Sequence, residues 1–154
     1  MTIRLRDLQA CFEGVIPSII ATASQDGVPN ISYLSHVGMV DDERVALSNQ
    51  FFSKTSANIQ ANNRATVLLV DPRDGAQYRL AVTFERSHDS GALFDATAAQ
   101  LRASSAQLGM DDVMRLRAVD LYRVDRVEAV PSPTAAAPLP SPDAGLTVAR
   151  PFTW

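Results

Sequence analysis

The chain has 154 residues, 46% of them hydrophobic and 20% charged, which is typical of one soluble domain with its own core. A formal net charge of −3 disfavours a general nucleic-acid surface, and a single cysteine, Cys11, excludes a disulfide framework within the chain and the usual zinc spacings. No apolar run approaches the roughly 18 residues that cross a bilayer, and the charged N-terminus does not resemble a signal peptide. We therefore expect a cytoplasmic protein without membrane contact.

Hydrophobic spacing in the first forty residues predicts a short helix and then a β-hairpin. Leu5, Leu8, Phe12 and Val15 recur at intervals of three and four, as on one face of an amphipathic helix. The stretch "SIIATAS" is rich in β-branched residues and predicts a strand, and "ISYLSHVGMV" over 31–40 predicts the returning strand. The Asp-Gly pair in the intervening "QDGVPN" favours a tight hairpin turn.

The next segment predicts a strand, a helix and another strand. The strand "VALSN" ends in two small polar residues. "TSANIQANN", over 55–63, predicts a two-turn helix with Ser53 or Thr55 as its N-cap. "ATVLLVD", over 65–71, is a continuous apolar run, which is typical of a central strand.

The second half of the chain predicts two further strands with a helix between them. In "QYRLAVTFER", Tyr78, Leu80, Val82 and Phe84 alternate with mostly polar residues, as in a half-buried antiparallel strand. The remaining elements are a helix over 90–108, a short helix or turn over 109–117, and a last strand over 118–130. Short antiparallel strands with helices inserted late indicate a mainly β protein, an antiparallel β-barrel with peripheral helices.

The composition changes after Val130, and we expect two parts, a domain over 1–130 and a tail or linker over 131–154. The second part contains six of the nine prolines and lacks helix or strand periodicity. It could dock its terminal "PFTW" onto the domain or lead to a further domain, and the sequence leaves both open.

The helix that begins near Ser53-Lys54-Thr55 is the first candidate site. The first turn of a helix leaves N–H groups unpaired and carries a partial positive charge, so it favours a phosphate. Lys54 would add a full charge, and Ser53, Thr55 and Ser56 would add hydroxyl donors. The alternative interpretation is an ordinary helix cap beside a solvated lysine.

Three stretches, taken in order, resemble one known family: "IIATASQDGVPNISYLSHV", "RVALSNQFFSKTSANIQANNRATVLLVD" and "GAQYRLAVTFER". The chain is similar, over roughly three-quarters of its length, to the pyridoxamine 5′-phosphate oxidase-related family of FMN-binding split barrels. The resemblance implies an antiparallel split β-barrel that binds FMN in a cleft between the two subunits of a homodimer. The "NQFFSKT" variant most resembles members found beside sensory or signalling domains.

The resemblance also implies roles for particular residues. Lys54 would bind the FMN phosphate, Ser48 and Asn49 would contact the cofactor from a strand end, and Gln77 would reach the flavin or its ribityl chain. Phe51 and Phe52 would either line the flavin ring or plug the barrel or dimer seam. The full set of expected cofactor-binding residues is Ser32, Tyr33, Ser48, Asn49, Phe51, Phe52, Ser53, Lys54, Thr55 and Gln77.

This chain departs from the oxidase members at the phosphate anchor. Ser32 and Val37 stand where those members have an arginine and a lysine in the second strand. Each lost charge-assisted hydrogen bond weakens binding by about 1.5–3 kcal/mol. Phosphate binding should therefore be weaker unless Arg64, Arg79 or an arginine of a partner chain compensates.

The expected function is that of an FMN-dependent oxidoreductase acting on an unknown small substrate. No catalytic residue and no metal site can be assigned, and His36 is interpreted as a packed strand residue. The alternatives are a non-catalytic flavin-binding sensory module, or a barrel that binds FAD, a deazaflavin or haem in place of FMN.

Overall fold

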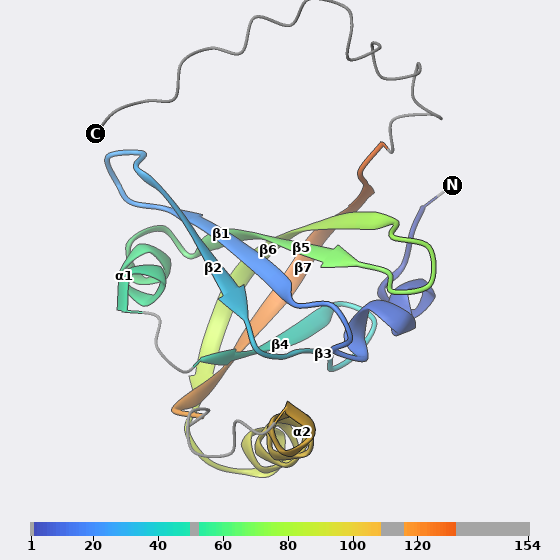
Figure 1. Ribbon diagram of the computed structural model, residues 1–154. Helices are drawn as coiled ribbons and strands as arrows, with labels where there is room; N and C mark the ends of the chain where they lie inside the picture. Colours follow the sequence, from blue (N-terminus) through green and yellow to red (C-terminus); the bar gives the residue numbers. More distant parts are fainter. Residues whose placement is uncertain (1, 50–52, 109–115, 132–154) are drawn as a thin grey trace, which may run out of the picture.

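The computed structural model describes residues 2–49, 53–108 and 116–131, which form one curled sheet with helices around it (Figure 1). The sheet is antiparallel and seven-stranded, in the order β2-β1-β5-β6-β7-β4-β3. Its strands are β1 (Ser18–Ala23), β2 (Pro29–Leu34), β3 (Val37–Met39), β4 (Arg44–Asn49), β5 (Arg64–Val70), β6 (Gln77–His88) and β7 (Ala118–Ala129). The helices are the 3₁₀ helix η1 (Leu5–Phe12), α1 (Ser53–Asn62) and α2 (Ala92–Leu108).

The connection between β2 and β3 shows why the sheet curls. These strands are consecutive in the chain, with only Ser35 and His36 between them, yet they lie at opposite edges of the sheet. The link from Leu34 to Val37 spans roughly 10 Å at most, so the two edges must come together. The predicted fold class, a mainly β antiparallel split barrel with peripheral helices, is confirmed.

The strand predicted over 31–40 is two strands, because the chain changes sheet edge in its middle. Ser48 of β4 holds this break: its hydroxyl accepts from the His36 backbone N–H at 3.0 Å and donates to the His36 carbonyl at 3.2 Å. Ser48 is fully buried. Periodicity alone could not predict the break, since residues on both sides of it favour strands.

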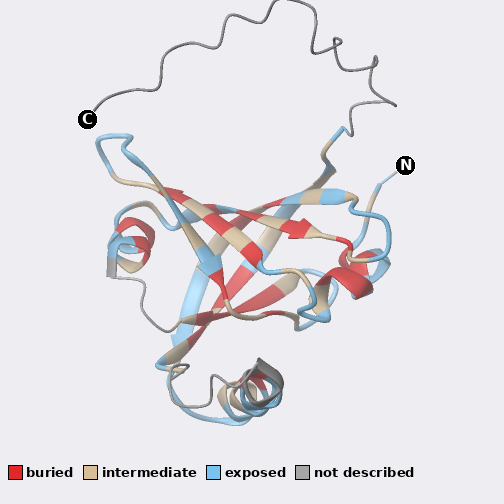
Figure 2. Ribbon diagram, in the orientation of Figure 1, coloured by how far each residue is buried: buried red, intermediate tan, exposed pale blue. Residues whose placement is uncertain are grey.

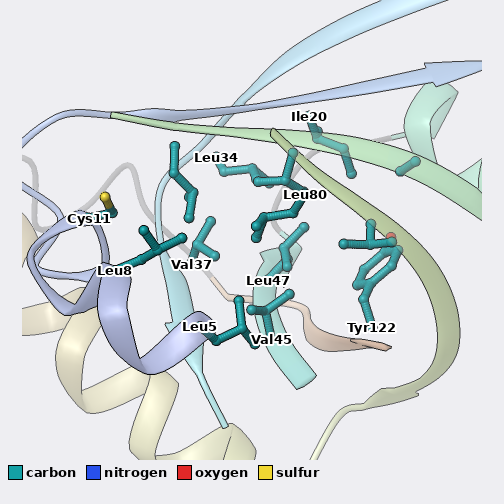
Figure 3. Close-up of a cluster of buried hydrophobic side chains, with 14 of the residues drawn as sticks. Leu5, Leu8, Cys11, Ile20, Leu34, Val37, Val45, Leu47, Leu80 and Tyr122 are labelled. Atoms are coloured by element: carbon teal, nitrogen blue, oxygen red, sulfur yellow. The ribbon is translucent and has the colours of Figure 1, made fainter. Parts of the chain in front are cut away.

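The core fills the inside of the curl, and buried residues alternate with more exposed ones along β1 and β5, whereas β4 is buried from Val45 to Ser48 (Figure 2). Leu5 and Leu8 of η1 cover one end of it, beside Val37 and Val45 of the sheet (Figure 3). Tyr122 of β7 is buried among them. The face expected for β6 is confirmed: Leu80 and Val82 are buried, and Tyr78 and Phe84 pack against the core. The neighbouring strands contribute Ile20, Val67 and Leu69 to the same core.

Two local predictions are corrected by the structure. The first helix is a 3₁₀ helix that ends at Phe12, so the buried residues Leu5, Leu8 and Cys11 follow a period of three, and Ala10 is buried beside them. Val15, expected on the apolar face, is 67% exposed. Strand β5 is central but alternates in burial, because nothing among the described residues covers its outer face at Thr66.

Several expectations fall outside the described residues. They include the short helix or turn expected over 109–117, of which only residues 116 and 117 are described, without regular structure, and nearly all of the proline-rich segment. The division at residue 130 stays a prediction. In the described ranges, no helix is long and apolar enough to cross a membrane.

Candidate functional site

The start of α1 lies against β2, and a buried hydroxyl joins the two elements. Thr55, in the first turn of α1, is 4% exposed. Its Oγ1 accepts from Asn30 Nδ2 at 3.0 Å and lies 3.1 Å from Ser32 Oγ. Two residues expected to bind the cofactor, Ser32 and Thr55, are thus brought together.

A second set of polar contacts fixes the rest of α1 on the hairpin of β1 and β2 (Figure 1). Asn58 Nδ2 donates to Thr22 Oγ1 at 3.0 Å, and both side chains are buried. At the C-terminal end of the helix, Asn62 Nδ2 donates to the carbonyl of Ala23 at 2.8 Å. Buried polar groups that are satisfied in this way specify one orientation, so the direction of the α1 N-terminus is fixed by the sheet.

Lys54 is exposed in the first turn of α1. In residues 2–49, 53–108 and 116–131, no carboxylate forms an ion pair with it. No acidic residue lies in that first turn either. The partial positive charge of the helix start and the lysine charge therefore add together at this point of the surface.

Asn49, at the end of β4, is joined to a residue that sequence reasoning missed. Its Nδ2 donates to Asp120 Oδ2 at 3.0 Å and lies 3.4 Å from Ser56 Oγ. The other carboxylate oxygen of Asp120 accepts from the Ser87 hydroxyl. Burial raises the pKa of Asp120, and these two donors oppose that rise. Only the pairing of β4 with β7 brings Asp120 to Asn49, and the local sequence carries no signal for it.

Two of the remaining expected residues, Tyr33 and Ser48, do not direct their side chains to the start of α1. Tyr33 follows Ser32 in β2, so it points to the opposite face of the sheet, where it is 73% exposed. Phe51 and Phe52 lie outside the described residues, and Ser53 is the first residue of α1. Ser48, as described above, uses its hydroxyl to hold the backbone of His36.

Gln77 lies far along the sheet from Asn49. It begins β6, whose other end, His88, pairs with Val119 of β7. Asn49 pairs with Ala118, the neighbour of Val119. The eleven steps of β6 between Gln77 and His88 cover roughly 36 Å of strand, so one chain does not bring Gln77 to Asn49.

The arginines that could replace the missing anchor are also distant from Lys54. Arg64 follows the C-terminal end of α1, and a helix of 10 residues is about 15 Å long. Arg79 is exposed on β6 and pairs with Leu68 and Glu128. Neither supports Lys54 within the same chain.

Two further residues have perturbed acidity without an assigned role. Burial lowers the pKa of His36, which favours the neutral ring. Burial raises the pKa of the Cys11 thiol to about 11, which makes it a poor nucleophile. No group of His, Cys, Asp and Glu side chains able to hold a metal ion occurs in the described part of the chain.

Comparison with solved structures agrees with this curled sheet. An FMN-binding protein from Syntrophomonas wolfei subsp. wolfei superposes with a TM-score of 0.67 at 16% identity, over 81% of this chain and 86% of that chain. HupZ from Group A Streptococcus superposes with a TM-score of 0.64 at 20% identity, over 84% of this chain and 96% of the HupZ chain. An F420 reductase superposes with a TM-score of 0.57 at 15% identity, over 78% of this chain and 94% of the reductase chain. No curated protein sequence matches the chain.

These similarities define a split-barrel protein. The profile of the pyridoxamine 5′-phosphate oxidase family matches residues 6–125, from η1 into β7. The chain therefore belongs to the pyridoxamine 5′-phosphate oxidase family.

Proposed function

We propose that this protein binds FMN at the start of α1 and acts as a flavin-dependent oxidoreductase on a small substrate. The observation that carries the proposal is the position of Lys54: it is exposed at a helix N-terminus that β2 holds through Thr55. The family profile and the FMN-binding structure with the same fold support a flavin as the ligand.

The phosphate would bind at the first turn of α1. Unpaired backbone N–H groups and the Lys54 ammonium are its donors there, and Ser56 is half-buried beside them. Thr55 is less available to the ligand, because it is buried and already bonded to Asn30. We assign it the role of fixing the helix start.

Asn49 would contact another part of the same ligand. Its amide nitrogen is taken by Asp120 and Ser56, so its free capacity is the carbonyl oxygen, an acceptor. An acceptor suits a ribityl hydroxyl or a ring N–H and repels a phosphate. Asn49 should therefore lie beside the sugar or ring of the flavin, away from the phosphate.

When bound, the flavin would supply hydride or electron transfer. The residues of this chain would bind its phosphate, orient its ring and exclude water from one side. This division of roles needs no acid or base from the protein.

We further propose a homodimer in which each flavin site uses both chains. An apolar patch of Ile31, Tyr33, Ile19 and Leu68 lies on the outer face of the sheet: Ile31 and Tyr33 are 71% and 73% exposed, and Ile19 pairs with both Tyr33 and Leu68. Exposed apolar patches of this kind favour contact with another protein surface. A second copy could also bring its Gln77 to the site, which one chain alone cannot do.

The phosphate contact can be tested with two charge-matched variants. Lys54→Gln removes the charge at the start of α1, and Arg64→Gln removes one beyond its other end. FMN affinity, measured by quenching of flavin fluorescence, should fall roughly tenfold or more in Lys54→Gln, the loss of one charge-assisted bond. It should be almost unchanged in Arg64→Gln. Equal affinities of wild type and Lys54→Gln would contradict the assignment.

A second candidate function is a flavin-binding module without turnover. The proline-rich segment over 131–154 favours it, because such a segment suits a connection to a further domain or protein. Steady oxidation of a reduced nicotinamide by the flavin-loaded protein would support the enzyme. Flavin binding without such turnover would support the module.

The identity of the cofactor is a separate question. FMN is proposed ahead of FAD, a deazaflavin or haem, although an F420 reductase shares the fold. The visible spectrum and mass of the chromophore released from the purified protein distinguish these four.

A further inference from the structure

A hollow of about 820 Å³ lies on the outer face of β1, β5, β6 and β7. The strand register explains its floor. Ala21 of β1 is opposite Thr66 of β5, and Thr66 is opposite Ala81 of β6. Three short side chains in one row leave space above the sheet, and we call this hollow the outer groove.

Three arginines line the outer groove. Arg126 of β7 continues the row, opposite Ala81. Arg64 and Arg123 flank Thr83 in a second row, because each pairs with it from a neighbouring strand. All three arginines are exposed. Three guanidinium groups and one carboxylate, that of Asp125, line the hollow, and this excess of positive charge favours an anion there.

A β-bulge shapes this end of the sheet. Ala81 pairs with Arg126 and Val82 pairs with Val124, so Asp125 has no partner on β6. Its carboxylate accepts from Thr83 Oγ1 at 2.5 Å and from Arg123 Nε at 2.9 Å. These bonds hold the pKa of Asp125 below its usual range, with the Thr83 bond the larger cause. Asp125 thus fixes the position of Arg123 Nε and leaves the two terminal nitrogens of that guanidinium unbonded to it.

The hydrogen bonds and ion pairs among the described residues leave most guanidinium donors available. Arg123 uses Nε alone, and so does Arg126, whose Nε lies 3.3 Å from Glu128 Oε1. Arg64 makes no side-chain bond to any other described residue. A guanidinium has five N–H donors, so the terminal nitrogens of all three remain for a ligand.

We infer that the outer groove binds a small organic oxyanion, a phosphate or carboxylate, whose flat apolar body lies on the row of short side chains. This site is distinct from the proposed flavin site. Thr22 and Asn62 also line the groove, but Asn62 is the last residue of α1, whereas the proposed phosphate site is at the first turn, about 15 Å of helix away. The inference therefore does not depend on flavin binding.

Phenyl phosphate and benzoate are suitable probes, in separate titrations of the full chain at constant ionic strength. Backbone amide shifts of Thr66, Ala81 and Thr83, observed by ¹H–¹⁵N NMR, report on the groove. We expect saturable shifts, and the probe that binds more tightly identifies the preferred oxyanion. In Arg64→Gln and Arg126→Gln the affinity should fall about tenfold each.

Lys54→Gln is the matched control, because it removes one exposed charge at the start of α1. It should leave the affinity of the groove unchanged while weakening FMN, and Arg64→Gln should do the reverse. Shifts that do not saturate, that sodium chloride reproduces at equal ionic strength, or that Lys54→Gln weakens as much as Arg64→Gln would overturn the inference.

Discussion

Asn49 Nδ2 lies 3.0 Å from Asp120 Oδ2, and this bond joins the end of β4 to β7 beside the start of α1. An ionised carboxylate only accepts hydrogen bonds, so it fixes which end of the Asn49 amide faces it. Protonation would remove that constraint, because a carboxylic acid can also donate. The orientation of Asn49 is therefore linked to the charge of Asp120.

Replacing Asp120 with asparagine should change how stability depends on pH. Burial raises the folded-state pKa of Asp120, so the folded protein holds this proton at pH values where the unfolded chain has lost it. Stability from this group is present below the ordinary pKa of about 3.9 and is lost as pH rises through the folded value. In chemical denaturation, the free energy of unfolding of Asp120→Asn should therefore increase relative to that of the wild type as the pH rises from 4 to 7.

Ser87→Ala tests the same linkage from the other side. The Ser87 hydroxyl stabilises the ionised form of Asp120 and lowers its pKa. Removing the hydroxyl should raise that pKa further, so the total loss of unfolding free energy between pH 4 and 7 should be larger than in the wild type. If the difference between Asp120→Asn and wild type is constant over this pH range, Asp120 is not the titrating group.

The hydroxyl of Thr55 should contribute to both stability and ligand affinity. Thr55→Val keeps the shape but leaves Asn30 and Ser32 without their shared partner, at a cost of about 1–3 kcal/mol in unfolding free energy. The same change at Thr66, exposed on β5, is the control and should cost almost nothing. Similar losses at both positions, measured in urea, would argue against the buried contact.

The inside of the curl should behave as a close-packed core. Leu80 is 0% exposed at the centre of the sheet, so Leu80→Ala should lower the unfolding free energy by about 2–5 kcal/mol. Val28→Ala, in the turn before β2 where Val28 is 52% exposed, should have a much smaller effect. Thermal or urea unfolding measures both, and a small effect at Leu80 would contradict the packing.

The apolar patch should control association. Tyr33→Lys places a charge at its most exposed position, so it should shift the proposed dimer towards monomer in light scattering. FMN binding should weaken at the same time, because each site would lose the partner's Gln77. Gln77→Ala should weaken FMN binding without changing the molar mass of the dimer measured by light scattering. A wild-type protein that is monomeric at micromolar concentration would remove the two-chain site.

Local patterns in the sequence predicted most of the elements because their signals are local. The alternation from Tyr78 to Phe84 is a direct consequence of one buried face, and the Asp-Gly turn before β2 needs only the positive φ of Gly27. The break at Ser35-His36 depends instead on β4, which comes later in the chain. No local pattern contains that information.

The sequence likewise predicted the part of the site formed by neighbouring residues and missed the part formed by strand pairing. Lys54 and Thr55 sit together because they are neighbours in a helix. Asp120 reaches Asn49 only through the pairing of β4 with β7, across 71 residues of chain. The outer groove likewise needs four strands in register, so neither feature could be read from one stretch of sequence.

The most direct measurement is a titration of the purified full chain with FMN, following the visible absorption and the fluorescence of the flavin. The predicted result is a saturable change, perturbed flavin bands and a clear loss of affinity in Lys54→Gln but not in Arg64→Gln. A folded, colourless protein that leaves the spectrum of added FMN unchanged would contradict flavin binding at the start of α1.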